Sequence, residues 1–106
     1  MDDFKVIYRI LKHLHEVMDY EDPDMEPIQP EQLRVTPERW EKLMVMLQKS
    51  GYVEGLQMYQ TLSASQPRLV LPARPQITLK GLEYLAENSF MKKAAALAKG
   101  IIEVTK

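Results

Sequence analysis

The chain has 106 residues, a formal net charge of -1 and no cysteine. This length fits one domain with one modest core, and a hydrophobic fraction of 45% is too high for a disordered chain. The absence of thiols excludes disulfides and cysteine-ligated metals, and no apolar run is long enough to span a membrane. We therefore expect a cytoplasmic protein with no membrane association.

Charge is distributed unevenly along the chain. Residues 1–54 carry twelve acidic and seven basic side chains, a balance of -5, and residues 83–106 carry three acids and four lysines, a balance of +1. Residues 55–82 carry no acid, so Arg68, Arg74 and Lys80 give this stretch +3. A dedicated DNA-binding protein is usually basic, so the net charge disfavours non-specific DNA affinity, whereas the acid-free stretch favours it locally.

The first predicted helix spans about Asp3 to Asp19. Its apolar side chains form two adjacent stripes at helical spacing. One stripe contains Phe4, Ile7, Leu11, Leu14 and Met18, and the other contains Val6, Ile10, His13 and Val17. An apolar arc this wide predicts two packing partners for the helix. The acidic, proline-containing residues 21–27 then predict a loop, most simply a solvated connector.

Two helices are predicted next. Pro30 occupies the first position of a helix that can have only one or two turns, because Thr36 and Pro37 begin the next helix soon after it. Thr36 is the expected N-cap of the following helix, which runs from Pro37 to about Ser50. The predicted core stripe of this second helix is Trp40, Leu43, Met44 and Leu47.

A hairpin and a further helix complete the predicted domain. Gly51 suits the left-handed position after a helix. Residues 52–61 and 69–71 are rich in residues that favour strands, residues 63–67 form a loop, and two later prolines indicate an edge strand. Thr78 is the expected N-cap of a helix that begins at Leu79. Its predicted inward residues are Leu82, Leu85 and Ala86.

Residues 89–106 form a predicted C-terminal helical extension. Phe90, Ala94, Leu97, Ile101 and Val104 are spaced four, three, four and three residues apart, as in a coiled-coil seam. The extension either packs on the first helix or pairs two chains, with Phe90, Ala94, Leu97 and Ile101 as the expected dimer contact. It can continue the preceding helix or form a separate one.

The order helix, hairpin, helix over residues 1–88 predicts a winged helix-turn-helix, mainly α with a small β-hairpin and thus of the α+β class. The segments Leu47–Gly55 and Ile77–Asn88 resemble the YjcQ family of small bacterial and prophage-associated proteins. The resemblance extends from the first helix to Asn88. It implies the winged-helix fold and no particular activity, and it provides no catalytic residue.

If the fold is a winged helix, the helix from Pro37 is the recognition helix. Its expected solvent-facing residues are Glu38, Arg39, Glu41, Lys42, Val45, Gln48 and Lys49. Arginine and glutamine side chains bind base edges, and lysines and arginines bind phosphates. Glu38 and Glu41 on the same helix oppose contact with a polyanion, so a solvated face of mixed charge explains these residues equally well. The candidate DNA-binding residues on this helix and on the hairpin are Arg39, Lys42, Gln48, Lys49, Arg68 and Arg74.

Two functions remain open after this reading of the sequence. One is binding of double-stranded DNA by a small prophage-associated transcriptional regulator. The other is a non-enzymatic protein–protein interaction module that keeps the scaffold without binding DNA, favoured by the net acidity and by Val45 and Met46, which lie off the core stripe. His13 and His15 are two residues apart and diverge on a helix, so we expect no metal site, and we expect His13 at a helix–helix contact instead. The sequence contains no Gly-rich phosphate loop and no G-x-S-x-G motif, so we expect no catalytic residue and no cofactor.

Overall fold

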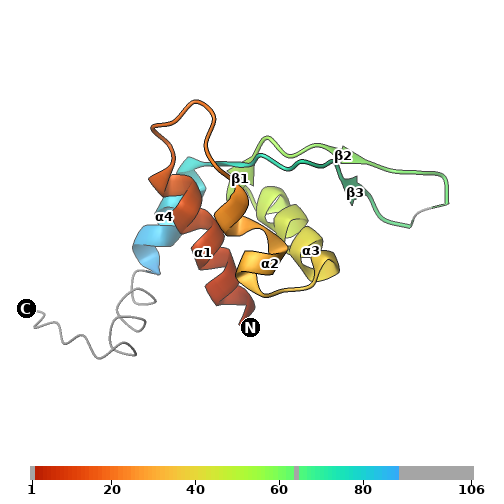
Figure 1. Cartoon of the computed structure of the whole chain (residues 1–106), viewed down its shortest axis with the longest axis horizontal. Coiled ribbons are helices and arrows are strands. Elements are labelled where there is room, and N and C mark those ends of the chain that lie inside the picture. Colours follow the sequence, from red (N-terminus) through yellow and green to blue (C-terminus); the bar gives the residue numbers. More distant parts are fainter. Residues whose placement is uncertain (1, 64, 89–106) are drawn as a thin grey trace, which may run out of the picture.

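The structure is a computed structural model that describes residues 2–63 and 65–88. Figure 1 shows a helical body, with α4 beside α1, and a long hairpin that projects from it. About half of the described residues are helical, and small antiparallel strand pairs accompany them, which is the predicted α+β class. In chain order the elements are α1 (Asp3–Glu16), the 3-10 turn η1 (Glu26–Ile28), α2 (Pro30–Leu33), α3 (Pro37–Lys49), β1 (Val53–Glu54), β2 (Met58–Tyr59), β3 (Arg68–Leu69), β4 (Gln76–Ile77) and α4 (Leu79–Glu87).

Threonine caps begin α3 and α4 where the sequence predicted them. The Thr36 hydroxyl accepts a hydrogen bond from the Arg39 N–H at 3.2 Å, and the Thr78 hydroxyl accepts one from the Gly81 N–H at 3.1 Å. Each bond satisfies an amide that has no partner inside its helix. The single turn of α2 begins with Pro30 in its first position, also as predicted.

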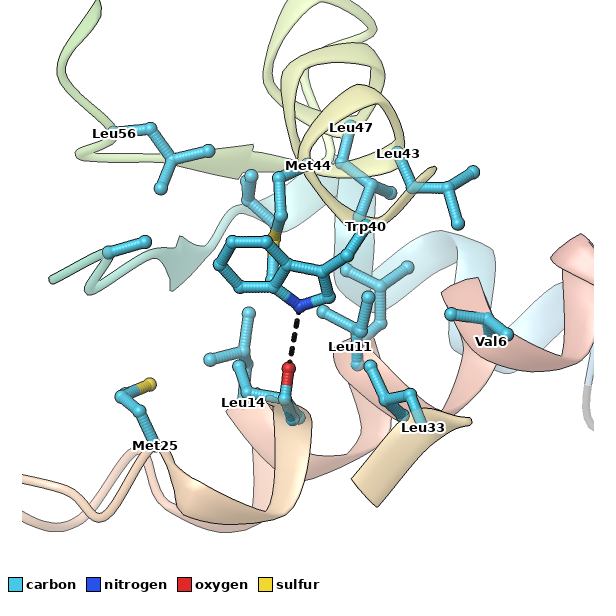
Figure 2. Packing of buried hydrophobic residues seen from close by; sticks show 14 of the residues in the cluster. Val6, Leu11, Leu14, Met25, Leu33, Trp40, Leu43, Met44, Leu47 and Leu56 are labelled. Atoms are coloured by element: carbon cyan, nitrogen blue, oxygen red, sulfur yellow. Dashed lines mark hydrogen bonds between the residues drawn. The ribbon is translucent and has the colours of Figure 1, made fainter. Parts of the chain in front are cut away.

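The core is centred on α3. Its predicted stripe is buried at every position, and the Trp40 indole N–H donates to the Ile28 carbonyl at 2.8 Å (Figure 2). This bond satisfies the buried ring nitrogen and joins α3 to η1. The buried core residues are Val6, Ile10, Leu11, Leu14, Met25, Ile28, Leu33, Trp40, Leu43, Met44, Leu47, Val53, Leu56, Leu69 and Ala73.

Two predictions about α1 are wrong. The helix ends at Glu16 rather than Asp19, and Phe4 and Met18 are 61% and 56% exposed. Met18 lies beyond the end of the helix, where helical spacing no longer applies. The buried face lies between the two predicted stripes, on Val6, Ile10, Leu11 and Leu14. Because α3, η1, α4 and β4 all contact α1, the described elements account for its wide apolar arc without residues 89–106.

The hairpin, residues 53–77, consists of two short antiparallel ladders. β1 pairs with β4, and β2 pairs with β3, in the registers Val53↔Ile77, Glu54↔Gln76, Met58↔Leu69 and Tyr59↔Arg68. The predicted strand over 52–61 is interrupted at residues 55–57, and the strand β4 was not predicted. Pro72 and Pro75 lie opposite the interruption and have no N–H to donate, so one continuous ladder cannot form there. Gly51 precedes β1 with a φ of 84°, as predicted.

The helix α4 packs against the base of the hairpin through Gly81. A Cβ at this position would lie 2.4 Å from the Tyr52 carbonyl oxygen and 2.7 Å from Cγ1 of Ile77, so the approach requires glycine. Of the predicted inward residues, Leu85 packs against the core and Leu82 is half-buried. Ala86 is exposed, because the inward face is centred on Gly81 rather than on the leucines. Asn88 is the C-cap of α4.

Candidate recognition surface on the third helix and the hairpin

The six side chains predicted to contact DNA all lie on α3 and the hairpin, and four of them have partners within the molecule. The three arginines each pair with a carboxylate from another segment, and the glutamine binds the hairpin backbone. Lys42 and Lys49 are exposed on α3, and among the described residues neither forms an ion pair. Contact of any of the six with DNA stays a prediction.

Arg39 joins the start of α3 to the start of α1. Its Nε lies 2.7 Å from Oδ1 of Asp3, and its Nη2 lies 2.6 Å from Oδ2, which is the bidentate geometry of a strong pair. The hydrogen bond from Arg39 lowers the pKa of the Asp3 carboxyl, and the same bond raises the pKa of Arg39. The guanidinium donors that base or phosphate contact would use are therefore directed at a carboxylate.

Arg68 pairs with Glu41, which also holds the strand β3. The Arg68 Nε lies 2.9 Å from Oε2 of Glu41, and the Leu69 N–H donates to the same oxygen at 2.7 Å. The hydrogen bond from Arg68, followed by the one from Leu69, lowers the pKa of Glu41. The Glu41 side chain is 20% exposed and that of Arg68 is 60% exposed. Glu41 therefore attaches the hairpin to α3, a role that the sequence did not indicate.

Gln48 binds both backbone groups of Leu56. Its Nε2 donates to the Leu56 carbonyl at 3.1 Å, and its Oε1 accepts from the Leu56 N–H at 2.8 Å. Glu41, Val45 and Gln48 are spaced four and three residues apart on α3 and are all half-buried. The prediction that these three side chains face solvent is wrong, because the hairpin crosses this side of the helix. Their regular spacing beside the core stripe is the signal that could have revealed a second covered face.

Arg74 connects the hairpin to the acidic loop. Its Nη2 binds Oδ1 of Asp22, and it donates to the Pro23 carbonyl at 2.9 Å. The acids that are missing from residues 55–82 are thus supplied by other segments of the chain. The loop is more than a solvated connector.

The same loop is also held from the side of α1. The His13 Nε2 lies 2.7 Å from the Asp24 carbonyl oxygen. His13 was expected at a helix–helix contact, and it makes a helix–loop contact instead. The loop is therefore fixed to both the hairpin and α1.

Two parts of this surface remain exposed. Met46 on α3 is 51% exposed, as predicted for a residue off the core stripe, and it lies among Glu38, Lys42 and Lys49. The hairpin tip, residues 59–67, contains no charged residue. In the tip, Tyr59 is 49% exposed and the Leu62 side chain is fully exposed. The tip lies at the far end of the projecting hairpin (Figure 1), so these exposed apolar side chains are located away from the helical body.

The remaining predictions concern metal sites, membrane-spanning helices and a dimer contact. Within residues 2–63 and 65–88, no three His, Cys, Asp or Glu side chains are grouped so as to hold a metal ion. No helix in the described part of the chain is long and apolar enough to cross a membrane. The predicted dimer contacts Phe90, Ala94, Leu97 and Ile101 lie outside the described residues.

Comparisons with known proteins place the chain in a family. No curated protein matches it. It is similar to the solution NMR structure of the YjcQ protein from Bacillus subtilis, with 25% sequence identity, a TM-score of 0.46, and coverage of 79% of this chain and 92% of that chain. The family model described as YjcQ protein matches residues 8–104. Because that match extends over most of the sequence, the chain belongs to the YjcQ family.

Proposed function

We propose that this chain is a non-enzymatic protein-interaction module on a winged helix-turn-helix scaffold. The scaffold assignment is supported by the order of the elements. In it, α2 and α3 are the helix-turn-helix pair, α3 is the recognition helix, and the hairpin is the wing, followed by α4. The threonine caps and the buried stripe of α3 give this arrangement its local basis. For either function we propose a cytoplasmic location, which the lack of cysteine suits.

The observation that carries the proposal is that four of the six side chains predicted to contact DNA are already engaged by partners within the molecule. A phosphate would have to replace Asp3 at Arg39, Glu41 at Arg68 and Asp22 at Arg74. Replacing Glu41 would also leave the Leu69 N–H without its acceptor. With a net charge of -1, the protein has little long-range attraction for a polyanion to offset these exchanges.

The hairpin tip is the surface that we assign to a protein partner. Protein interfaces are depleted of charge at their centre and enriched in aromatic side chains. The tip is uncharged, exposes Tyr59 and Leu62, and stands clear of the helical body (Figure 1). A partner with a shallow apolar pocket would receive Leu62, and Tyr59 is a second exposed apolar side chain of the tip.

A second candidate is binding of double-stranded DNA, as by a small prophage-associated transcriptional regulator. Lys42 and Lys49 support it, because both are exposed on α3 and neither forms an ion pair among the described residues. Surface ion pairs contribute only about 0–1 kcal/mol each, so the exposed arginines could exchange a carboxylate for a phosphate at small cost. This function would use the open face of α3 rather than the tip.

One pair of measurements separates the two functions. Fluorescence anisotropy with duplex DNA over a range of salt concentrations should show no salt-sensitive binding. Binding that weakens steeply with salt, and that Lys42→Gln with Lys49→Gln reduces, would instead support the regulator.

The second measurement tests the hairpin tip directly. A protein captured from the native host by the wild-type chain should be lost with Tyr59→Ser and Leu62→Ser. Met18→Ser is the matched control, because Met18 is an exposed apolar residue on another part of the surface. Capture that both variants retain equally would contradict the assignment of the tip.

A further inference from the structure

One exposed face of α3 presents an apolar side chain between two cations. Lys42, Met46 and Lys49 are four and three residues apart, so they lie on one side of the helix, and we call them the basic stripe. Both lysines are exposed, and among the described residues neither forms an ion pair. Met46 is 51% exposed. The basic stripe therefore has two positive charges that the described domain does not balance.

The loop between α1 and η1 presents the opposite arrangement. Its residues Asp19, Tyr20 and Glu21, which we call the acidic segment, have an aromatic side chain between two acids. Tyr20 is 65% exposed, and in residues 2–63 and 65–88 neither acid forms an ion pair. The contacts made by Arg74 and His13 hold the rest of the loop in place. A segment held in this way loses less conformational freedom on binding than a free loop would.

The basic stripe and the acidic segment match in charge and in apolar content. Opposite charges across an interface favour the pairing of the two surfaces that carry them. Lysine side chains are long and flexible, so Lys42 and Lys49 can converge on two carboxylates. Met46 and Tyr20 complete the match, because methionine sulfur makes favourable contacts with aromatic rings.

The two surfaces lie on different parts of the domain. Figure 1 shows the loop after α1 projecting from the body near α4, whereas α3 lies on the other side of α1. No ion pair joins the two surfaces within the part of the chain that the structure describes. A contact between them is therefore a contact between two molecules, in which each copy uses a different surface.

Glu38 limits where on α3 the acidic segment can bind. It is exposed one turn before Lys42, on the same side of the helix. Its negative charge repels an approaching carboxylate. The acidic segment is therefore expected over the last two turns of α3, between Lys42 and Lys49.

We infer that the basic stripe of one copy of this chain binds the acidic segment of a second copy. A standard interface has about 20–30 residues on each side, and these two surfaces are much smaller, so the association is weak and depends on concentration. The inference goes beyond the proposed function, because the contact uses neither the hairpin tip nor a different protein.

Light scattering on the full chain, purified free of nucleic acid, tests this pairing. At low salt the mass of the wild type should rise above that of a monomer with increasing concentration, and added salt should reverse the rise by screening the exposed charges. Lys42→Gln with Lys49→Gln should raise the dissociation constant roughly tenfold, and so should Asp19→Asn with Glu21→Gln. All four positions are exposed, so circular dichroism should show an unchanged fold.

A mixture of the two double variants gives the most specific result. The lysine variant keeps its acidic segment, and the acid variant keeps its basic stripe. Mixed in equal amounts, the two should associate as tightly as the wild type and stop at the mass of a dimer, because the surfaces left over have no charged partner.

The matched control removes the same charge from α1. Lys5→Gln with Lys12→Gln changes the net charge as the α3 variant does, and it should associate like the wild type. Equal weakening by this control would overturn the inference, because net charge alone would then be responsible. A wild type that stays monomeric at every concentration would also overturn it, as would a mixture that associates no better than either variant alone.

Discussion

Different interactions stabilise the helical body and the hairpin. In the body, Ile10, Leu11, Leu33 and Met44 are completely buried. In the hairpin, every described residue from 59 to 68 is exposed, and its attachment to the body includes polar contacts from Glu41, Gln48 and Asp22. Burial of a large apolar side chain contributes about 1.5–3 kcal/mol, whereas a hydrogen bond contributes about 0.5–1.5 kcal/mol net.

This difference indicates that the hairpin can be loosened while the body stays folded. Each polar contact of the hairpin can be removed by one substitution, whereas Val53, Leu56, Leu69 and Ala73 anchor its base in the core. Removing an apolar side chain from the body, in contrast, weakens a cluster that includes residues from α1, η1, α2 and α3, and against which Leu85 of α4 packs. The predictions below test this contrast.

The largest effect is expected in the body. Leu11→Ala removes a completely buried side chain that packs in the core around Trp40 (Figure 2). Such a change should lower the free energy of unfolding by about 2–5 kcal/mol. Urea denaturation followed by circular dichroism measures it. A loss below 1 kcal/mol would mean that the body does not depend on this core.

Gly81→Ala should have the next largest effect, at the junction of α4 with the hairpin. The added Cβ would lie 2.4 Å from the Tyr52 carbonyl oxygen, so backbone must move and the free energy of unfolding should fall by about 1–3 kcal/mol. The rings of Tyr52 and Tyr84 pack edge-on with their centroids 5.3 Å apart, so the near-ultraviolet circular dichroism should change too. Ala86→Ser, at an exposed position of the same helix, should change neither signal appreciably.

Gln48→Leu should loosen the hairpin selectively. The substitution removes both hydrogen bonds to Leu56, so the backbone N–H and carbonyl of Leu56 lose these partners. We expect the Leu56 amide to exchange faster with deuterium, by a local free energy of about 1 kcal/mol, while amides in the core of α3 keep their protection. Gln57→Leu, at an exposed neighbouring position, is the control. Equal loss of protection in α3 and the hairpin would show that the two regions unfold together.

Acid should produce the smallest effect. Because folding lowers the pKa of Glu41, its stabilising contribution is complete above the ordinary value of 4.5 and is lost as pH falls through the lower folded value. The contribution should be below about 1 kcal/mol, since Arg68 is 60% exposed. This contribution is measured by the hydrogen-exchange protection of the Leu69 amide as the pH is lowered.

A control is needed for this titration because Asp3 also has a lowered pKa and titrates in the same direction. Glu41→Gln should abolish the acid dependence at Leu69 and leave the Asp3 contact unchanged. If Leu69 in this variant still loses protection on acidification as the wild type does, then Glu41 is not the group responsible.

The sequence alone determined the parts of the fold that depend on neighbouring residues. Thr36 and Thr78 cap their helices with hydrogen bonds to amides three residues later. The stripe from Trp40 to Leu47 repeats at the helical period, and Gly51 takes the left-handed conformation that ends α3. These features follow from capping, periodicity and the freedom of glycine, which are all visible within a few positions of the chain.

Only the tertiary structure decided what the charged side chains do. Asp3 and Arg39 are 36 residues apart, Glu41 and Arg68 are 27 apart, and Asp22 and Arg74 are 52 apart. No local pattern links such pairs, so an acid-free segment in the sequence predicted an exposed basic wing. Folding brings carboxylates from α1, α3 and the acidic loop to these arginines, because each pair forms only where two distant backbone segments pack together.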